Sequence, residues 1–225
     1  MKEILSVLEQ CALFDQIRPE DLQGMLGCLG ARPTAVKKGQ TLFHEGDPAV
    51  EIGIVITGSV QLVREDYYGN RSILAHIGPG ELFGESYAFS KARVLPVSVI
   101  ADEDCRLLLL DSRRISVCCS HACSFHSQVI FNLLRLEATK NLMLHQKIQI
   151  TSNRTTRDKL MAYLMHEAKL CGCSEFTIPY DRQALADYLE VDRSGLSAEI
   201  SKLRKEGILR CEKNRFQLLS SRNPW

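Results

Sequence analysis

Residues 182–204 read RQALADYLEVDRSGLSAEISKLR, and this stretch decides the architecture of the C-terminal part of the chain. Residues 182–189 predict a short helix, and a break follows in which Asp192 is a good N-cap for the next helix. The second helix carries apolar residues at i, i+4 and i+7: Leu196, Ile200 and Leu203. The pattern predicts two short helices joined by a tight turn, the second with a buried apolar face and a free polar face.

Two such helices have the geometry that places a recognition helix in the DNA major groove. A hairpin predicted over residues 208–219 would form a β-wing near phosphates, which argues against an ordinary helical hairpin on a small domain. Glu190 departs from the pattern, because it stands where the turn usually has glycine for a positive φ. The predicted DNA contacts are Arg182, Arg193, Ser194, Ser197, Ser201, Lys202, Arg204, Lys213 and Arg215.

The N-terminal half differs in character. Helical patterns occupy residues 3–30, and from residue 39 to residue 84 the chain places eight of its 14 glycines. Short turn-separated strands are typical of a compact antiparallel roll or barrel, here ending near Asp111. The predicted strands cover residues 41–43, 52–56, 60–63, 72–77, 97–100 and 106–110.

Between these two parts, residues 112–150 follow a helical pattern with a narrow heptad stripe. Such a stripe suits a two-helix seam, although a helix packed on its own roll is the alternative. The predicted dimer interface is Val129, Leu133, Leu136, Met143 and Ile150. Residues 151–156 form a polar break, so the expected organisation is 1–111, 112–150 and 151–225.

The bulk composition sets limits on function. The net charge is +1, divided into −2 over residues 1–150 and +3 over residues 151–225, so the C-terminal part is the better candidate for phosphate contacts. No apolar run reaches the roughly 18–20 residues of a membrane span, and the N-terminus lacks the pattern of a signal peptide. We therefore expect a cytoplasmic protein with no membrane partner. No P-loop, Gly-x-Ser-x-Gly or metal-hydrolase motif occurs, so an enzyme is not expected.

The chain resembles the Crp/Fnr family of bacterial transcription regulators over nearly its full length. The resemblance is carried, in order, by residues 39–47, 54–60, 77–85 and 182–204, with the heptad helix between the last two. It implies an α+β fold: an antiparallel β-roll like a cyclic-nucleotide-binding jelly roll, a long dimerisation helix and a winged helix-turn-helix. It also implies a homodimer that binds a palindromic promoter site in double-stranded DNA under the control of an effector, with RNA polymerase as a further partner.

In nucleotide-binding members a Gly-Glu pair is followed by Arg-Ser/Thr-Ala, whose Arg pairs with the cyclic phosphate. Here Gly84 and Glu85 match, but the Arg position falls on Leu95 and the next on Pro96. A buried phosphate without a cation is poorly compensated, so cyclic AMP is disfavoured and the effector is an unknown small molecule. The resemblance places the effector pocket at Gly84, Glu85, Ser86, Arg93, Leu95, Pro96, Leu144 and His145.

The nine cysteines are expected to be mostly free thiols. Cys118, Cys119, His121, Cys123 and His126 could bind a metal or form a thiol switch, or they could simply pack a helix on the roll. Cys171 and Cys173 alone do not make a zinc site.

Two histidines, His76 and His145, could ligate haem, as some relatives sense gases that way; a packed or solvent-facing role is the alternative. A haem- or metal-based redox or nitrosative-stress regulator is therefore the alternative within the class. From another class, the roll could be the cyclic-nucleotide-binding module of an enzyme or channel, where the winged motif would have no role.

Overall fold

The structure, a computed structural model, describes residues 2–65, 67–68, 71–117 and 124–219. The chain forms two compact units, residues 1–139 and residues 140–225. The division lies within the long helix α5 (Ser124–Thr151), whereas the sequence predicted a boundary at the polar break that follows it. The reason is that the end of α5 packs on the second unit, where Ile150 is buried in the core.

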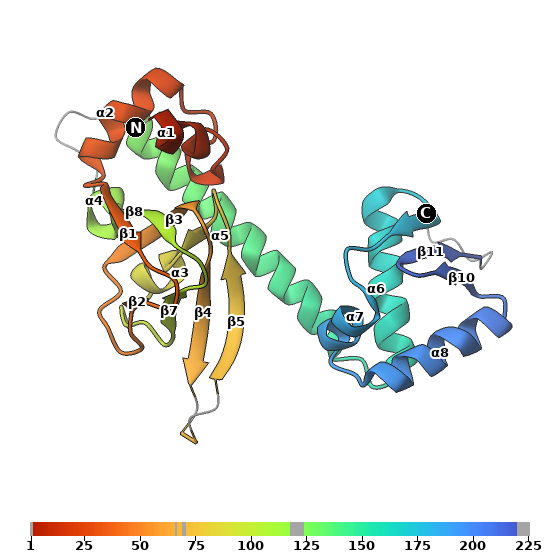
Figure 1. The fold of residues 1–225 in the computed structure, drawn as a ribbon. Helices are drawn as coiled ribbons and strands as arrows, with labels where there is room; N and C mark the ends of the chain where they lie inside the picture. The colour runs from red at the N-terminus through yellow and green to blue at the C-terminus, as the bar shows by residue number, and fades with distance from the viewer. Residues whose placement is uncertain (1, 66, 69–70, 118–123, 220–225) are drawn as a thin grey trace. The chain divides into compact units, whose positions relative to one another are not determined.

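The first unit is built on a β-roll of two four-stranded antiparallel sheets (Figure 1). The strand order is β1-β8-β3-β6 in one sheet and β2-β7-β4-β5 in the other. The strands are β1 (Arg32–Val36), β2 (Thr41–Phe43), β3 (Glu51–Thr57), β4 (Val60–Glu65), β5 (Arg71–Ile77), β6 (Leu82–Phe83), β7 (Ser98–Ala101) and β8 (Cys105–Asp111). The predicted antiparallel roll is therefore confirmed, with β1 and β6 as strands that the sequence pattern did not indicate.

Side chains from both sheets make the core of the roll, among them Phe83 and Leu107 of the first sheet and Val99 of the second. Gly53 on β3 leaves room for the Phe83 ring, because a Cβ at this position would lie 1.9 Å from Phe83 Cζ. A side chain at position 53 would therefore force β6 away from β3, its partner in the sheet.

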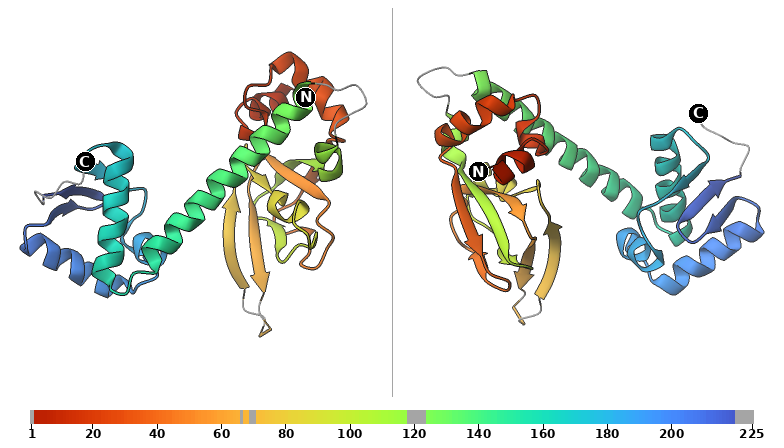
Figure 2. Two further views of the ribbon diagram at one scale, coloured as in Figure 1. Left: turned by 180° about the vertical axis from the view of Figure 1, so that it is seen from behind. Right: turned by 45° about the horizontal axis from the view of Figure 1, so that its top comes forward.

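Helices cover one end of the roll, where α1 and α2 lie beside the start of α5 (Figure 2). The helical elements of this unit besides α5 are α1 (Lys2–Leu8), the short 3₁₀ turn η1 (Ala12–Phe14), α2 (Pro19–Cys28), α3 (Glu85–Ala88) and α4 (Ser112–Ser116). On α5 the buried Asn132 donates hydrogen bonds from Nδ2 to the carbonyl oxygens of Leu13 (3.0 Å) and Asp15 (2.8 Å). These bonds fix one face of α5 against the N-terminal helices.

The second unit holds the predicted helix pair and wing. Its elements are α6 (Thr156–Cys171), β9 (Glu175–Thr177), α7 (Arg182–Leu189), α8 (Arg193–Lys205), β10 (Leu209–Glu212) and β11 (Arg215–Leu218). The strands form an antiparallel sheet in the order β10-β11-β9, next to a core contributed by all three helices. Each helix begins at a side-chain cap, provided by Thr155, Asp181 and Asp192 in turn. The winged helix-turn-helix is therefore confirmed at the level of fold.

In the described part of the chain, no helix combines the length and the apolarity needed to cross a bilayer.

Candidate nucleic-acid interface and effector cavity

Helix α8 has two distinct faces. Its apolar residues Leu196, Ile200 and Leu203 are all buried in the core of the second unit. The other predicted contact residues lie on the surface: Arg193, Ser194, Ser201, Lys202 and Arg204 are exposed, and Ser197 is half-buried. The helix thus offers a continuous hydroxyl- and guanidinium-bearing face to a partner.

The start of α8 is fixed by Asp192. Its carboxylate accepts hydrogen bonds from the Ser194 hydroxyl (2.5 Å) and from the Gly195 backbone N–H (2.8 Å). These two bonds favour the ionised form and lower the pKa of the Asp192 carboxyl below its usual value. The cap therefore sets the position of Arg193, the first helical residue, which makes no ion pair or side-chain hydrogen bond within the described part of the chain.

The turn before α8 has the predicted unfavourable conformation. Glu190 adopts φ 55° and ψ 52°, the left-handed region in which glycine is the least strained residue. The Val191 N–H donates to the Ala186 carbonyl (3.0 Å) and closes the end of α7. The Lys159 ammonium on α6 donates a hydrogen bond to the Leu189 carbonyl (3.2 Å). A cation therefore satisfies a carbonyl oxygen at the C-terminal end of α7 that has no partner within the helix.

The far end of α8 is tied to α6. Arg157 on α6 pairs with Glu206 (Nη1 to Oε1, 3.1 Å) and approaches Glu199 on α8 (3.6 Å). This pairing holds the C-terminal end of α8, and the Asp192 cap holds its N-terminal end. The recognition helix is therefore fixed at both ends. Glu199 is thereby directed towards α6 and away from the exposed face of α8.

The wing is the hairpin of β10 and β11. Glu212 pairs with Arg215 across a two-residue turn, and Lys213 in that turn has φ 53°. Lys213 and Arg215 are both exposed, as a wing that meets phosphates requires. Arg215 forms an ion pair with Glu175 on β9 (2.6 Å), so its charge is partly engaged within the chain.

Arg182 connects the wing to the helix pair. It lies in the first turn of α7, and its Nη2 donates to the Lys213 carbonyl and to the Cys211 sulfur, both at 3.4 Å. The guanidinium also lies over the Phe216 ring, with its central carbon 5.8 Å from the ring centroid. The structure therefore gives Arg182 a positioning role for the wing, which the sequence pattern did not indicate.

The first unit contains a cavity of about 420 Å³ between α3, α4 and α5. Its lining is mostly apolar and includes Phe89, Ile115 and Leu133, with two carboxylates, Glu85 and Glu137. The Ser86 hydroxyl donates to Glu137 (3.2 Å to Oε2) and connects α3 to α5. Among the residues that the structure describes, none that lines this cavity is Lys, Arg or His.

Comparison with known proteins agrees with this arrangement. The family model of the cyclic nucleotide-binding domain matches residues 33–121, and the Crp-like helix-turn-helix domain matches residues 158–222. The chain belongs to the Crp/Fnr family. The order of the two domains is the one that the family motifs in the sequence indicated.

Among relatives, the Cyclic AMP receptor protein of Thermus thermophilus is 34% identical over 98 residues, 44% of each chain. The chain thus matches less than half the length of this relative. It matches still less, 36%, of the CRP-like cAMP-activated global transcriptional regulator in each of two Mycobacterium tuberculosis strains. The nitrogen fixation regulation protein FixK of Azorhizobium caulinodans is 23% identical, with 94% of this chain and 83% of FixK covered.

Two solved structures share the fold. CprK in complex with OCPA matches with a TM-score of 0.61 at 16% identity, over 89% of this chain and 90% of that one. The c-di-GMP responsive regulator CLP of Xanthomonas campestris matches with a TM-score of 0.53 at 20% identity, over 91% of this chain and 100% of that one. At these identities the likeness concerns the fold alone.

The residues predicted around the Crp/Fnr effector site are only partly brought together. Gly84 (φ 85°) begins α3, and the buried Glu85 and exposed Ser86 line the cavity. Leu95 is buried, but Arg93 and Pro96 are exposed, and none of these three lines the cavity. Leu144 and His145 are exposed residues of the second unit. The sequence did not point to Phe89, Ile115 or Glu137, because only the fold brings α3, α4 and α5 together.

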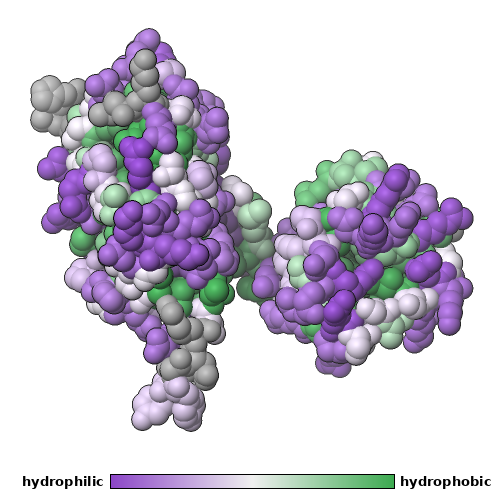
Figure 3. Space-filling view, viewed as in Figure 1, coloured by the Kyte–Doolittle hydropathy of each residue, from purple (hydrophilic) through white to green (hydrophobic). Residues whose placement is uncertain are grey.

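The predicted dimer residues of α5 lie mostly inside the chain. Val129 and Leu133 are buried in the first unit and Ile150 in the second. Leu136 packs partly against the first core, and Met143 is exposed. The apolar residues that α5 leaves on the surface are Phe131, Leu134, Leu142, Met143, Leu144 and Ile148. Apolar surface along α5 is visible in Figure 3.

The described cysteines differ in whether they form a disulfide. Cys171 and Cys173 form a disulfide, so the expectation of free thiols is wrong for this pair. Cys11, Cys28, Cys105 and Cys211 are free, and burial raises the pKa of the Cys11 thiol to about 11.

Of the predicted metal or thiol-switch group, only His126 lies within the described residues. Cys118, Cys119, His121 and Cys123 lie outside the described residues. His126 is buried, with Nε2 3.2 Å from the Arg114 carbonyl oxygen. Of the proposed haem ligands, His76 is exposed, with Nδ1 3.9 Å from the Asp102 carboxylate.

Proposed function

We propose that the chain is a sequence-specific DNA-binding transcription regulator that inserts α8 into the major groove and acts on RNA polymerase at a promoter. The observation that carries the proposal is the exposed polar face of α8, fixed at both ends and accompanied by a basic wing. Helix-turn-helix proteins read bases from the first turns of this helix, where Arg193 and Ser197 lie. The matching Crp-like helix-turn-helix domain supports the same use of these residues.

Selection of duplexes from a random pool tests this function. The wild-type protein should enrich a palindrome with half-sites about one helical turn, ~34 Å, apart. If Arg193 contacts guanine bidentately, Arg193→Ala should cost about 1–3 kcal/mol and relax the preference at one position in each half-site. Lys169→Ala removes an exposed cation from the last turn of α6 and is the matched control. If neither Arg193→Ala nor Ser197→Ala changes affinity or sequence preference, α8 is not the reading helix.

We also propose that the regulator is a homodimer through an exposed face of α5. Residues on this face recur at alternating steps of four and three, the spacing of a two-helix seam. They are Ile130, Leu134, Glu137, Asn141, Leu144 and Ile148, of which Ile130 and Glu137 are half-buried and the other four are exposed. Asn141 is the type of polar seam residue that fixes register in such pairs, and Glu137 is a second polar residue of the same seam. The proposed seam replaces the predicted one, because Val129, Leu133 and Ile150 are used by the chain's own cores.

The effector is a small molecule other than cyclic AMP, bound in the cavity of the first unit. Glu137 in its lining would repel a cyclic phosphate, and none of the described lining residues is a cation that could compensate it. The buried, apolar Leu95 stands at the position where nucleotide-binding members of the family have arginine. Calorimetric titration with cyclic AMP should therefore give no binding heat, and a micromolar isotherm would refute this part of the proposal.

A further inference from the structure

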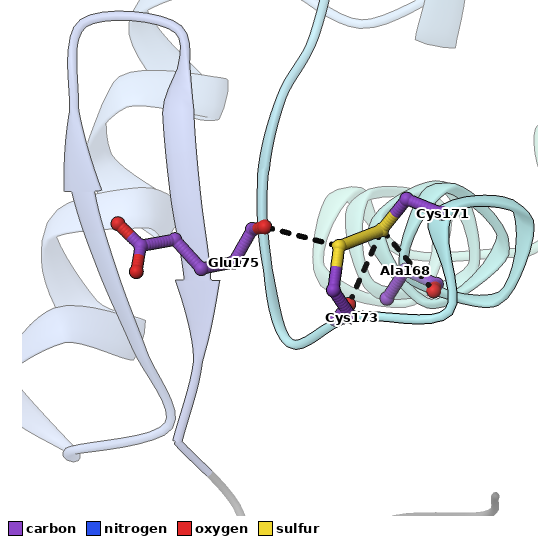
Figure 4. The surroundings of a disulfide bond; sticks show 4 residues. All are labelled: Ala168, Cys171, Cys173 and Glu175. Carbon is purple, nitrogen blue, oxygen red and sulfur yellow. Dashed lines mark hydrogen bonds between the residues drawn. A yellow bond between two sulfur atoms is a disulfide. The ribbon is translucent and has the colours of Figure 1, made fainter.

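The sequence Cys171-Gly172-Cys173 ends α6 and begins the loop to β9. Its two sulfurs are joined in a disulfide (Figure 4). Both cysteines are exposed. The exposed end of α6 also carries apolar surface in the space-filling view (Figure 3). The bond is therefore within reach of small thiols and disulfides in solution, and its sulfurs can be attacked without unfolding of the unit.

The backbone brings the two sulfurs together through the helix cap. Gly172 adopts φ 64° and ψ 23°, and both its N–H and that of Cys173 (3.2 Å) donate to the Ala168 carbonyl. This left-handed cap reverses the chain so that Cys171 and Cys173 share one side of the turn. A disulfide that closes so short a loop constrains the unfolded chain little, since that constraint grows with loop length. Global stabilisation is therefore a poor explanation of the pair.

The same turn leads directly into the wing sheet. The Ser174 carbonyl accepts a hydrogen bond from the Leu218 N–H (2.8 Å), and Glu175 on β9 pairs with Gln217 on β11. The Cys173 sulfur lies 3.1 Å from the Glu175 carbonyl oxygen. The Glu175 carboxylate in turn holds Arg215. A chain of contacts thus runs from the disulfide to a cation of the wing.

We propose that Cys171 and Cys173 are a reversible dithiol–disulfide site that regulates DNA binding through Glu175 and Arg215, an inference that rests on the proposed function. The oxidant is a low-molecular-weight disulfide. One cysteine thiolate attacks a sulfur of that disulfide and displaces one thiolate, which leaves a mixed disulfide. The second cysteine thiolate then attacks the first cysteine's sulfur and displaces the other thiolate. The two cysteines lose two electrons and two protons, and the small disulfide becomes two thiols.

The sign of the effect follows from the loss of the covalent link. Reduction breaks the S–S bond that ties the Cys171 side chain to the Cys173 side chain. The loop before β9 then regains rotational freedom. Glu175 is held less firmly beside Arg215, and the guanidinium becomes available to a phosphate. The reduced form therefore binds DNA more tightly than the disulfide form.

The experiment uses the full-length protein after treatment with dithiothreitol or with oxidised glutathione. Trypsin releases residues 170–182 as one peptide that contains no other cysteine, so mass spectrometry after alkylation reports this pair alone. Fluorescence anisotropy measures affinity for a labelled duplex carrying the palindrome selected above. We expect a disulfide peptide after oxidation and an affinity about threefold to tenfold lower, the effect of one phosphate contact per protomer.

Three variants test whether the redox response of DNA binding depends on the Cys171–Cys173 pair. The double variant Cys171→Ser/Cys173→Ser should bind tightly under both conditions, and so should Glu175→Gln, which frees Arg215 without touching the cysteines. Cys28→Ser, a matched exposed cysteine of the first unit, should keep the full redox response. A peptide that stays reduced, or a redox response that persists in the double variant, overturns the inference. Loss of DNA binding in both redox states instead refutes the proposed function, while the peptide still shows whether the pair is redox-active.

Discussion

Helices α8 and α5 carry apolar repeats of similar clarity in the sequence, but only one repeat translates directly into structure. In α8 the residues at i, i+4 and i+7 are the buried ones, and the polar residues opposite are on the surface. In α5 the heptad stripe that begins at Val129 is buried for part of its length and exposed at Met143. The difference lies in the number of neighbours that each helix has.

Helix α8 packs on a single core, so one apolar face is sufficient. Helix α5 packs on the N-terminal helices through Val129 and Asn132 and on the second core through Ile150, and it leaves Leu134 and Ile148 exposed. Hydrophobic periodicity shows that a face is buried, but it does not name the neighbour that buries it. A helix with several neighbours therefore carries several overlapping stripes.

The largest expected effect distinguishes the buried face of α5 from its exposed face. Val129→Asp places an unpaired charge in the first core and should lower the free energy of unfolding by about 3–5 kcal/mol. Leu134→Asp, on the exposed face of the same helix, should leave the circular dichroism spectrum unchanged but give a monomer in light scattering. Urea unfolding and light scattering of both variants measure the two effects.

The assignment of one α5 face to the core and the other to the dimer seam would be wrong if the effects of the variants were exchanged. A dimer that survives Leu134→Asp together with Ile148→Asp would show that the exposed face is not the seam. A Val129→Asp protein that stays folded but becomes monomeric would restore the first predicted interface.

The next effect concerns α8. Leu203 is fully buried, so Leu203→Ala should destabilise the second unit by about 2–5 kcal/mol through lost burial and the cavity left behind. Ser201, two residues earlier, is exposed, and Ser201→Ala should change stability by less than about 0.5 kcal/mol. Urea unfolding of both variants gives the contrast, and equal losses would mean that α8 does not have one buried face.

What could be predicted from the sequence was set by local chemistry. The antiparallel strands, the α7–α8 pair, the Asp192 cap and the strained turn at Glu190 all follow from residues close together in the chain. What could not be predicted depends on distant segments. The cavity joins Glu85 to Glu137, Arg182 reaches Lys213, and the phase of α5 depends on Asn132 meeting Leu13.

The pH dependence of the α8 cap gives a smaller effect. Because the pKa of the Asp192 carboxyl is lower in the folded protein, its stabilising effect is present above the unfolded value of about 3.9 and is lost as the pH falls through the folded pKa. Asn in its place also caps a helix but does not titrate. The melting temperature of wild type should exceed that of Asp192→Asn at neutral pH, and the difference should shrink in acid. A constant difference would contradict the proposed role of this carboxylate.

The smallest effect tests the turn that precedes α8. Glu190 has a left-handed backbone without being glycine, and its carbonyl lies within reach of the Lys159 ammonium (3.4 Å), so the main chain and not the side chain makes the useful contact. Glu190→Gly removes the steric strain of a Cβ in this conformation, while the added flexibility of the unfolded chain offsets part of the gain. We expect a net stabilisation of about 0.5–1 kcal/mol by urea unfolding. Glu190→Ala keeps the Cβ and removes only the carboxylate, so it should stay near wild type. If the two variants gain equally, the Glu190 carboxylate and not the backbone conformation is the source of the strain.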